Sequence, residues 1–303
     1  MHAIELENVC KSFGPVRAVD GLTVHVPQGC VYGFLGPNGA GKTTTLRMIM
    51  DIIRPDHGAI RLFGEPASSP VRNRVGYMPE ERGLYRKMTV AAVLRYFGSL
   101  KGMTAEQLGR QVPAWLERID LAAHARKKVE ELSRGMHQKL QFAATVINDP
   151  ELVILDEPFS GLDPVNQDML RELIDTMRRE GRTILFSTHV MHEAERLCDF
   201  IVLINQGAVV VNGTLDEIRA GHESRTVSLE LEEDGGFLRT LPFVASVKPD
   251  GRRMDVTLRE GADPQDLLKT LVERARVRVF EIKQPSLHEI FVRLVGGAHV
   301  EDR

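Results

Sequence analysis

Residues 36–44 read Gly-Pro-Asn-Gly-Ala-Gly-Lys-Thr-Thr, which is a complete phosphate-binding loop. The apolar run 31–35 before it predicts a buried strand, and residues 44–50 after it have the spacing of a helix. Glycines let such a loop fold tightly around phosphate groups, and the N-terminus of the following helix adds partial positive charge. We therefore expect this loop to bind the phosphates of a nucleotide.

The whole loop is predicted to take part in this binding, through Gly36, Pro37, Asn38, Gly39, Ala40, Gly41, Lys42, Thr43 and Thr44. Pro37 has no N–H, so the backbone donors are expected to come from Gly39 to Thr44. Lys42 is expected to reach the β- and γ-phosphates, and the Thr43 hydroxyl to bind Mg²⁺. A glycine-rich turn that binds nothing is the alternative, and the flanking strand and helix argue against it.

A second motif, Glu-Leu-Val-Ile-Leu-Asp-Glu-Pro, occupies residues 151–158. Its apolar residues predict a central buried strand that Pro158 ends, with two carboxylates at the exit. Asp156 is expected to bind Mg²⁺, directly or through water. Glu157 is expected to act as the general base that polarises the attacking water. Two solvated acids at a strand end are the alternative, which the phosphate loop makes less favoured.

The composition is that of an ordinary globular enzyme. The chain has 303 residues, 43% hydrophobic and 27% charged, which is enough for one large domain and a smaller one. Its net charge of −3 gives no reason to expect nucleic acid as a partner. Its three cysteines lack metal-ligand spacing, which suits a reducing cytoplasm. Neither a signal-peptide pattern nor a membrane-spanning apolar stretch is evident, so any membrane role is expected to act through a partner.

A third motif, Glu-Leu-Ser-Arg-Gly-Met-His-Gln-Lys, lies between the other two at residues 131–139. Ser133 is expected to cap the helix that follows. The motif resembles the signature loop of ATP-binding cassette (ABC) proteins, usually written Leu-Ser-Gly-Gly-Gln, from which it departs at Arg134 and Met136. The resemblance to this family, carried by the order of the motifs, covers roughly residues 1–220.

Three further residues match the pattern of ABC proteins. Phe13, in Lys-Ser-Phe-Gly, matches the aromatic residue that stacks on adenine. Asp163, in Ser-Gly-Leu-Asp, matches the D-loop residue that crosses to a second subunit. His189, at the end of an apolar strand, matches the switch histidine that contacts the γ-phosphate. Taken alone, Phe13 is more often a core residue and His189 an incidental one.

The resemblance implies an α/β fold of the P-loop NTPase class and ABC ATPase type in residues 1–221, with an inserted helical subdomain at about 86–148. It implies an ATPase subunit that powers solute transport, with export favoured, through a separate integral membrane permease. Such a subunit is cytoplasmic and peripheral on the inner face of the cell membrane. The family's dimer implies that ATP and Mg²⁺ lie between the phosphate loop of one copy and Ser133 and Gly135 of a second copy.

The loop at residues 77–85 departs from the family, because Glu80 stands where Gln is usual. A carboxylate can bind Mg²⁺ or its water, but near the γ-phosphate it adds unfavourable charge that Arg82 or Arg86 could offset. We hypothesise that this loop is coupled tightly to metal occupancy. Residues 85–88 are candidates for a contact with the permease. These variants resemble a bacterial export-type subgroup often compared with sodium-efflux ATPases.

Residues 222–303 have a different character and predict a small α+β domain, with the strand and helix pattern of a split β-α-β fold. Asp263 and Pro264 are expected to open one helix. Ser286 and Glu289 are expected to form a capping box at the start of the last helix. Nothing in this segment has catalytic spacing. A regulatory or dimerising module and a stabilising extension are equally consistent with it.

Two rival functions use the same phosphate loop. A soluble ABC ATPase that acts on DNA or ribosomes usually carries two cassettes or a long coiled-coil insertion, and the sequence has neither. A kinase or GTPase gives no reason for the motif at residues 131–139. The transported solute is not encoded in this chain, because it would bind the permease.

Overall fold

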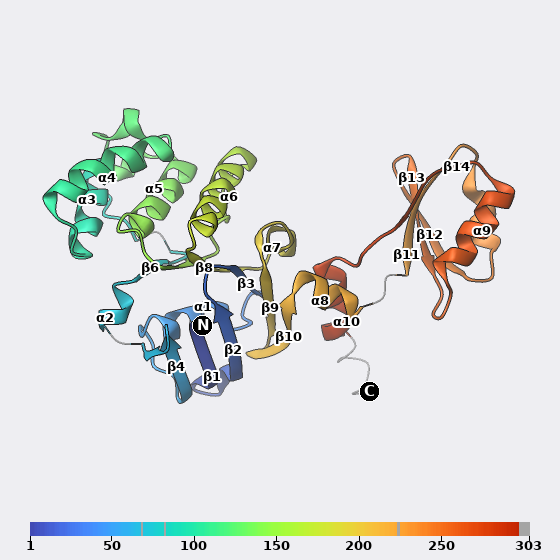
Figure 1. Ribbon diagram of the computed structural model, residues 1–303, viewed down its shortest axis with the longest axis horizontal. Coiled ribbons are helices and arrows are strands. Elements are labelled where there is room, and N and C mark those ends of the chain that lie inside the picture. The colour runs from blue at the N-terminus through green and yellow to red at the C-terminus, as the bar shows by residue number, and fades with distance from the viewer. Residues whose placement is uncertain (68, 82, 223–224, 297–303) are drawn as a thin grey trace. The chain divides into compact units, whose positions relative to one another are not determined.

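The computed structural model describes residues 1–67, 69–81, 83–222 and 225–296. The chain divides into two compact units, Met1–Leu215 and Asp216–Arg303 (Figure 1). The larger unit contains the three sequence motifs. No helix of the described residues is both long enough and apolar enough to cross a membrane.

A six-stranded sheet forms the centre of the larger unit, in the order β10-β9-β3-β8-β7-β6. Its strands are β3 (Val31–Leu35), β6 (Val75–Met78), β7 (Leu152–Asp156), β8 (Thr183–Thr188), β9 (Phe200–Asn205) and β10 (Ala208–Thr214). All pairs are parallel except β9 with β10. The strands β3, β7 and β8 are buried along their whole length, as expected for parallel strands covered on both faces. Their carboxyl ends meet at one edge, which is where such sheets bind ligands.

An antiparallel sheet in the order β2-β1-β4-β5 lies on the other side of helix α1 (Lys42–Ile49). Its strands are β1 (His2–Phe13), β2 (Val16–Pro27), β4 (His57–Leu62) and β5 (Glu65–Pro66). Leu46 and Met48 of α1 are buried in one core cluster with residues of both sheets. The helix that begins at the phosphate loop is therefore fixed on two sides by apolar packing.

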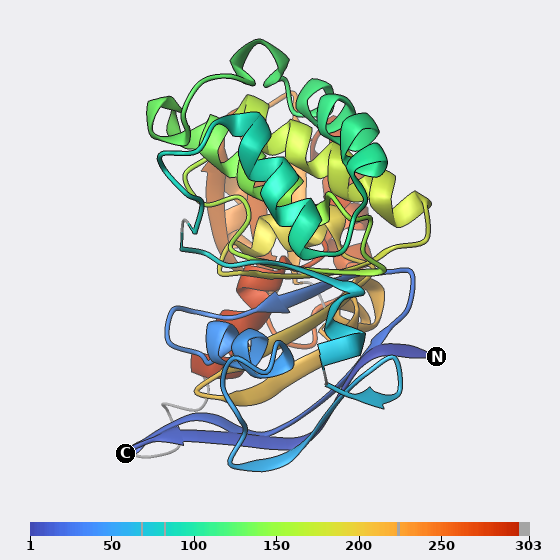
Figure 2. The same cartoon turned by 90° about the vertical axis from the view of Figure 1, so that its left-hand side faces the viewer.

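Helices gather on one side of these sheets in the larger unit (Figure 2). They are α3 (Val90–Leu100), α4 (Ala105–Arg118), α5 (Arg134–Val146) and α6 (Pro164–Arg179). The larger unit also has two shorter helices, α2 (Ser69–Arg72) and α7 (Met191–Leu197). Two 3₁₀ turns, η1 (Ala122–His124) and η2 (Val129–Glu131), lie between α4 and α5 in the chain. Helices α3 to α5 fall within residues 86–148, the segment in which the resemblance implies a helical subdomain. Thr89, Thr104, Ser133 and Asp163 cap the N-termini of α3 to α6 with their side chains.

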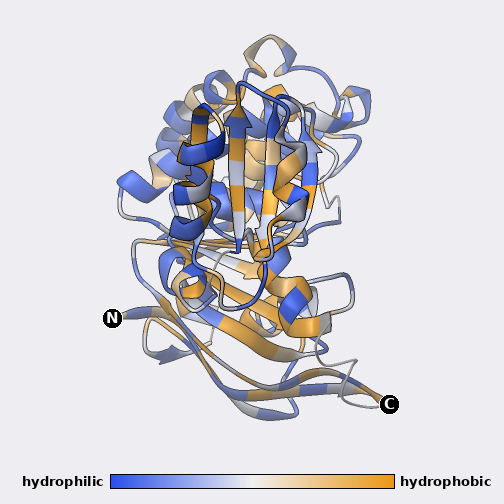
Figure 3. Ribbon diagram, turned by 90° about the vertical axis from the view of Figure 1, so that its right-hand side faces the viewer, coloured by the Kyte–Doolittle hydropathy of each residue, from blue (hydrophilic) through white to orange (hydrophobic). Residues whose placement is uncertain are grey.

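The smaller unit contains an antiparallel sheet in the order β12-β13-β11-β14. Its elements are β11 (Thr226–Leu231), η3 (Gly235–Thr240), β12 (Val244–Asp250), β13 (Arg253–Leu258), α9 (Pro264–Arg274), β14 (Val277–Ile282) and α10 (Leu287–Gly296), and α8 (Leu215–Ala220) precedes them. This is the strand order of a split β-α-β fold in which η3 stands in place of the first helix. Hydrophobic and hydrophilic residues alternate along the strands (Figure 3), and Leu267 and Leu271 of α9 are fully buried in the apolar core.

Both predicted helix starts in the smaller unit are found. The Asp263 side chain accepts a hydrogen bond from the N–H of Gln265, and Pro264 begins α9. The Ser286 hydroxyl accepts from the N–H of Glu289, and the N–H of Ser286 donates to the Glu289 carboxylate at 2.8 Å. The capping box predicted before α10 is confirmed.

Candidate functional site

The phosphate loop connects the buried strand β3 to α1, as predicted. Gly41 has φ +100°, and a Cβ there would lie 2.3 Å from the carbonyl oxygen of Ala18, so only glycine fits. The Lys42 ammonium donates to the carbonyls of Gly36 at 2.8 Å and Pro37 at 3.2 Å. Ala40 is one of the predicted backbone donors to phosphate, but its N–H donates to the Pro37 carbonyl within the loop at 3.2 Å.

A cavity of about 480 Å³ opens at this loop. It brings together residues from the phosphate loop and from the ends of β6, β7 and β8. Its lining consists of Ala18, Asn38, Gly39, Gly41, Lys42, Thr43, Thr44, Glu80, Glu157 and His189. The parallel sheet explains this meeting, because the strands place their carboxyl ends at one edge. The volume and the polar lining suit the phosphate end of a nucleotide.

Asp156 ends β7 and is completely buried. Its Oδ1 accepts a hydrogen bond from the Ser187 hydroxyl, and the Thr43 hydroxyl lies 3.4 Å from the same oxygen. Its Oδ2 is buried and has no hydrogen-bond partner among the residues that the structure describes. Burial raises the pKa of the Asp156 carboxyl, and the hydrogen bonds from Ser187 and Thr43 oppose that rise.

These donors fit Mg²⁺. Mg²⁺ binds a few protein oxygens together with phosphate and water oxygens. The Thr43 hydroxyl and the Asp156 carboxylate, whose Oδ2 has no partner among the described residues, are oxygens of this kind. Within the part of the chain that the structure describes, no cluster of three or more His, Cys, Asp or Glu could hold a metal alone.

Glu157 follows Asp156 in a left-handed backbone conformation, with φ +49°. Non-glycine residues avoid this region, at a cost of about 1–3 kcal/mol. The N–H of Glu157 donates to Ser187, both to the carbonyl oxygen at 3.2 Å and to the hydroxyl at 3.1 Å. Its Oε1 lies 3.0 Å from Nδ1 of His189 and 3.5 Å from Nζ of Lys42. The carboxylate thus faces the cavity between two nitrogen groups.

Ser187 is a residue that sequence reasoning missed. It lies on β8 directly opposite Asp156 of β7 in the parallel register, is fully buried, and bonds to both residues of the acidic pair. The sequence shows Ser187 two positions before His189 but gives no register between the two strands. Only the pairing of β7 with β8 connects them.

The other predicted residues lie outside the lining of the cavity. Ser133 caps α5 by accepting from the N–H of Met136 at 3.3 Å. Asp163 caps α6 and accepts from the N–H of Asn166 at 3.1 Å, and hydrogen bonds from Asn166 lower the pKa of Asp163. A Cβ on Gly135 would lie 3.0 Å from Nδ2 of Asn166, so the two helix starts are neighbours.

Phe13 ends β1 and is paired with Val16 of β2. Its side chain is 49% exposed, and Nζ of Lys11 lies 5.6 Å from the ring centroid. The ring is therefore available at the surface, and Phe13 is not a core residue.

Arg82, which the sequence suggested as a partner for the charge of Glu80, lies outside the described residues.

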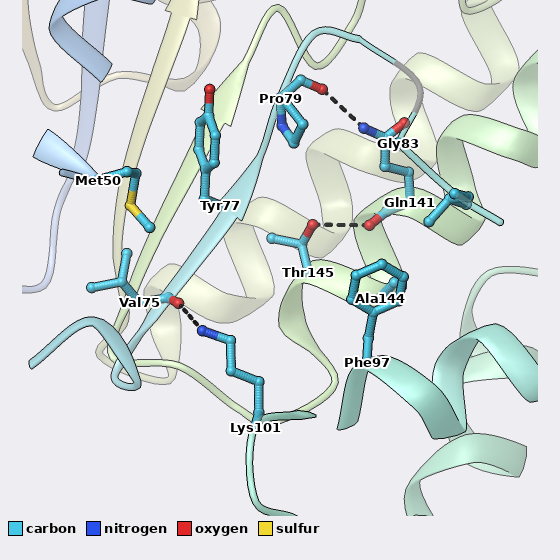
Figure 4. A pocket seen from close by; sticks show the side chains of 11 residues that line it. Met50, Val75, Tyr77, Pro79, Gly83, Phe97, Lys101, Gln141, Ala144 and Thr145 are labelled. Carbon is cyan, nitrogen blue, oxygen red and sulfur yellow. Dashed lines mark hydrogen bonds between the residues drawn. The ribbon is translucent and has the colours of Figure 1, made fainter. Parts of the chain in front are cut away.

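Helix α5 also contacts the two loops that reach the cavity, through glutamines that sequence reasoning missed. The side chain of Gln138 is buried and its Nε2 donates to the carbonyl of Pro158 at 3.1 Å, next to Glu157. One turn later, Nε2 of Gln141 donates to the carbonyl of Pro79 (Figure 4). The same nitrogen donates to the carbonyl of Glu81, so its two acceptors lie on either side of Glu80. No sequence motif marks these contacts, because they depend on how α5 packs.

Comparison with known proteins gives consistent matches. Residues 19–160 match the family described as ABC transporter, and residues 213–295 match the family described as ATP-binding protein DrrA1-3-like, C-terminal domain. The chain is 40% identical over 296 residues to the uncharacterized ABC transporter ATP-binding protein YhaQ of Bacillus subtilis (strain 168), with 98% of this chain and 99% of the relative covered. It is 38% identical to the Nod factor export ATP-binding protein I of Paraburkholderia xenovorans (strain LB400), with 97% of each chain covered.

A solved structure described as the ATP binding subunit of an ABC transporter is also similar. It has a TM-score of 0.68 and 32% sequence identity, and the match covers 72% of this chain and 92% of that chain. The fold of an ABC ATPase, which the sequence predicts, is thereby confirmed.

Proposed function

Because this chain belongs to the ABC transporter family of ATP-binding proteins, we propose that it hydrolyses ATP to ADP and phosphate and thereby powers solute export through a separate membrane permease. The observation that carries the proposal is the cavity in which Lys42, Thr43, Glu157 and His189 meet. Export is favoured because relatives of nearly the same length are named as export ATP-binding proteins.

Six side chains in the cavity or beside it have a proposed task in this reaction. Thr43 and Asp156 would hold Mg²⁺, with Glu80 as a further oxygen ligand, and the ion would supply positive charge to the phosphates. Lys42 would bind the β- and γ-phosphates. Glu157 would take the proton of the attacking water as the general base, and His189, 3.0 Å from that carboxylate, would orient it and contact the γ-phosphate.

We propose a dimer of two copies as the active form. The Ser133 hydroxyl, the Gly135 N–H and the positive end of α5 form an anion-binding surface, yet they lie outside the lining of the chain's own cavity. They would therefore bind the γ-phosphate held by Lys42 of a second copy. Asp163 would fix this surface as the cap of α6 and contact the facing copy.

The proposed permease contact, at residues 85–88, begins at the last residue of the loop that contains Glu80 (residues 77–85, here called the Glu80 loop). Tyr85 is 51% exposed, and its ring meets Tyr96 edge to face at 5.1 Å. Tyr96 meets Phe97 in the same way at 5.5 Å. Tyr96 and Phe97 are themselves half-buried, and a partly exposed aromatic cluster of this kind suits a protein partner. Binding there would hold the protein on the inner face of the membrane, and we propose this peripheral location in the cytoplasm.

A phosphate-release assay tests the hydrolysis. The purified protein should release phosphate from ATP in the presence of Mg²⁺, and should stop when EDTA removes the metal. Lys42→Ala should abolish release because the γ-phosphate loses its cation, whereas Arg110→Ala, at an exposed position of α4, should not. Equal release by wild type and Lys42→Ala would contradict the proposal.

Affinity purification from membranes solubilised in mild detergent tests the partner. The protein should retain an integral membrane protein, identified by mass spectrometry, and Tyr85→Ala should release it. Retention of ribosomes or nucleic acid in its place would favour the rival function, a soluble ABC ATPase.

The domain boundaries at 221 and 222, and the role of the smaller unit, stay predictions.

A further inference from the structure

The strand that leads to Glu80 is attached at both ends to the helical layer. At its start, the Lys101 ammonium at the end of α3 donates to the carbonyls of Val75 at 3.0 Å and Arg72 at 3.3 Å. At its end, Nε2 of Gln141 in α5 donates to the carbonyls of Pro79 at 2.9 Å and Glu81 at 3.2 Å. Figure 4 shows both attachments, with Gln141 pointing from its helix toward the loop. The backbone on each side of Glu80 is thus fixed by one amide.

The Gln141 side chain is 4% exposed, and within the described part of the chain its buried Oε1 has no hydrogen-bond partner. A buried amide oxygen without a partner is unfavourable, because it loses the hydrogen bonds that it makes with water. An apolar side chain of the same length would fill this space without that cost. The property that only the amide supplies is its pair of N–H donors, and both are directed at the Glu80 loop.

Helix α5 also carries the anion-binding surface proposed for the dimer. Ser133 caps its N-terminus, and Gln141 lies about two turns further along the same helix. A helix moves as a rigid body over so short a distance. A displacement of Ser133 toward a second copy's nucleotide therefore displaces Gln141, and with it the Glu80 loop that lines the chain's own cavity.

We propose that Gln141 is a positioning residue, which couples the position of α5 to the placement of Glu80 in the nucleotide cavity. Nothing in its geometry brings Gln141 into the cavity, so it acts only through Glu80. This inference rests on the proposed function, because it assigns Glu80 a task in hydrolysis. A purely structural role for Gln141, in which it fills space under the loop, is the alternative that an experiment must exclude.

A double-mutant cycle separates these two roles. Gln141→Met keeps the length of the side chain and removes both donors. We expect it to lower kcat about fivefold to tenfold, with the Kd of ATP changed less than about twofold, because two hydrogen bonds to the loop are lost. Glu80→Ala should lower kcat by at least as much. In the Glu80→Ala protein, Gln141→Met should have no further effect, because Gln141 acts through Glu80.

Hydrogen exchange supplies a readout that needs neither nucleotide nor turnover. Peptides that cover residues 76–88 should exchange faster in Gln141→Met than in wild type, and Glu80→Ala alone should leave them unchanged. Gln141→Asn, which keeps the amide but shortens its reach, should show the same increase and replaces Gln141→Met if that variant fails to fold. Gln111→Met, at an exposed position of α4, is the matched control and should match wild type in both assays.

The outcomes are distinct. If wild type releases no phosphate, the proposed function is wrong. If wild type is active but the two substitutions lower kcat by independent factors, or Glu80→Ala has no effect, the coupling is overturned. Unchanged exchange in both Gln141 variants overturns it as well.

Discussion

Two carboxylates, Asp156 in the larger unit and Asp255 in the smaller one, differ in how their charge is balanced. Each has one buried oxygen that finds no hydrogen-bond partner in the described ranges of the chain. Asp255 accepts from the Lys283 ammonium at 2.7 Å, so an opposite charge already neutralises it. Asp156 accepts from two hydroxyls, those of Ser187 and Thr43. Its charge therefore remains available for a cation, whereas that of Asp255 does not.

The surroundings of the two residues follow the same division. Around Asp156, the strand ends of a parallel sheet collect Glu157, Lys42 and His189 in one cavity, with the backbone of Glu157 in a strained conformation. Around Asp255, ion pairs lie along an antiparallel sheet and are partly exposed, as between Arg253 and Glu281. From this comparison we predict that the residues around Asp156 carry the chemistry, and that the ion pairs around Asp255 contribute to stability alone. The following changes test this division.

The largest effect is expected from Glu157→Gln. The amide keeps the shape of the side chain but cannot take the proton of water, so kcat should fall by about 10²–10⁴. ATP binding should persist and the dimer should accumulate, as measured by phosphate release and by size-exclusion chromatography with ATP. Rapid turnover by this variant would remove Glu157 as the base.

A large effect on stability, with none on activity, is expected from Leu267→Ala. Leu267 is fully buried in the core of the smaller unit, so the cavity should cost that unit about 2–5 kcal/mol. Urea unfolding should show an earlier transition for this unit, and the rate of phosphate release should stay within about twofold of wild type. Val272→Ala, where the side chain is 70% exposed, is the control. A parallel loss of activity would show that the smaller unit supports the site.

An intermediate effect is expected from Ser187→Ala, which removes the hydroxyl shared by Asp156 and Glu157. We expect kcat to fall about tenfold, because the backbone of Glu157 loses one of its two acceptors. The Mg²⁺ concentration for half-maximal activity should also change, since Oδ1 of Asp156 loses a donor. Ser187→Thr keeps the hydroxyl and should recover most of the rate; failure of this recovery would point to packing as the cause.

The smallest effect is expected from Lys283→Met. The Lys283 side chain is 38% exposed, and an ion pair of this kind contributes at most about 1 kcal/mol. Chemical unfolding should show this small loss, and phosphate release should not change. A loss of several kcal/mol in the free energy of unfolding would mean that the charge of Asp255, like that of Asp156, is poorly neutralised by the remaining residues. The contrast between the two carboxylates would then fail.

Much of the molecule followed from the sequence by local rules. The phosphate loop, the acidic strand and the order of the motifs predicted the family and the fold, and both are confirmed. Residues 36–41 form the loop between strand and helix, because the apolar run before them forms a strand and glycine adopts the positive φ values that the turn requires. Ser133, Asp263 and Ser286 were predicted to cap helices for the same reason, since a cap involves only its neighbours in the chain, whereas the cap that Asp163 forms on α6 was not predicted.

Contacts between distant segments were decided by the tertiary structure alone. Ser187 meets Asp156 because of the register between β7 and β8, and Gln141 meets the Glu80 loop because α5 packs against it. The sequence showed that Asp156 and Glu157 are acidic and end a strand. It did not show that one carboxylate oxygen is buried without a partner. Burial and register depend on the sum of many packing contacts, whereas caps, turns and loops depend on a few neighbouring residues.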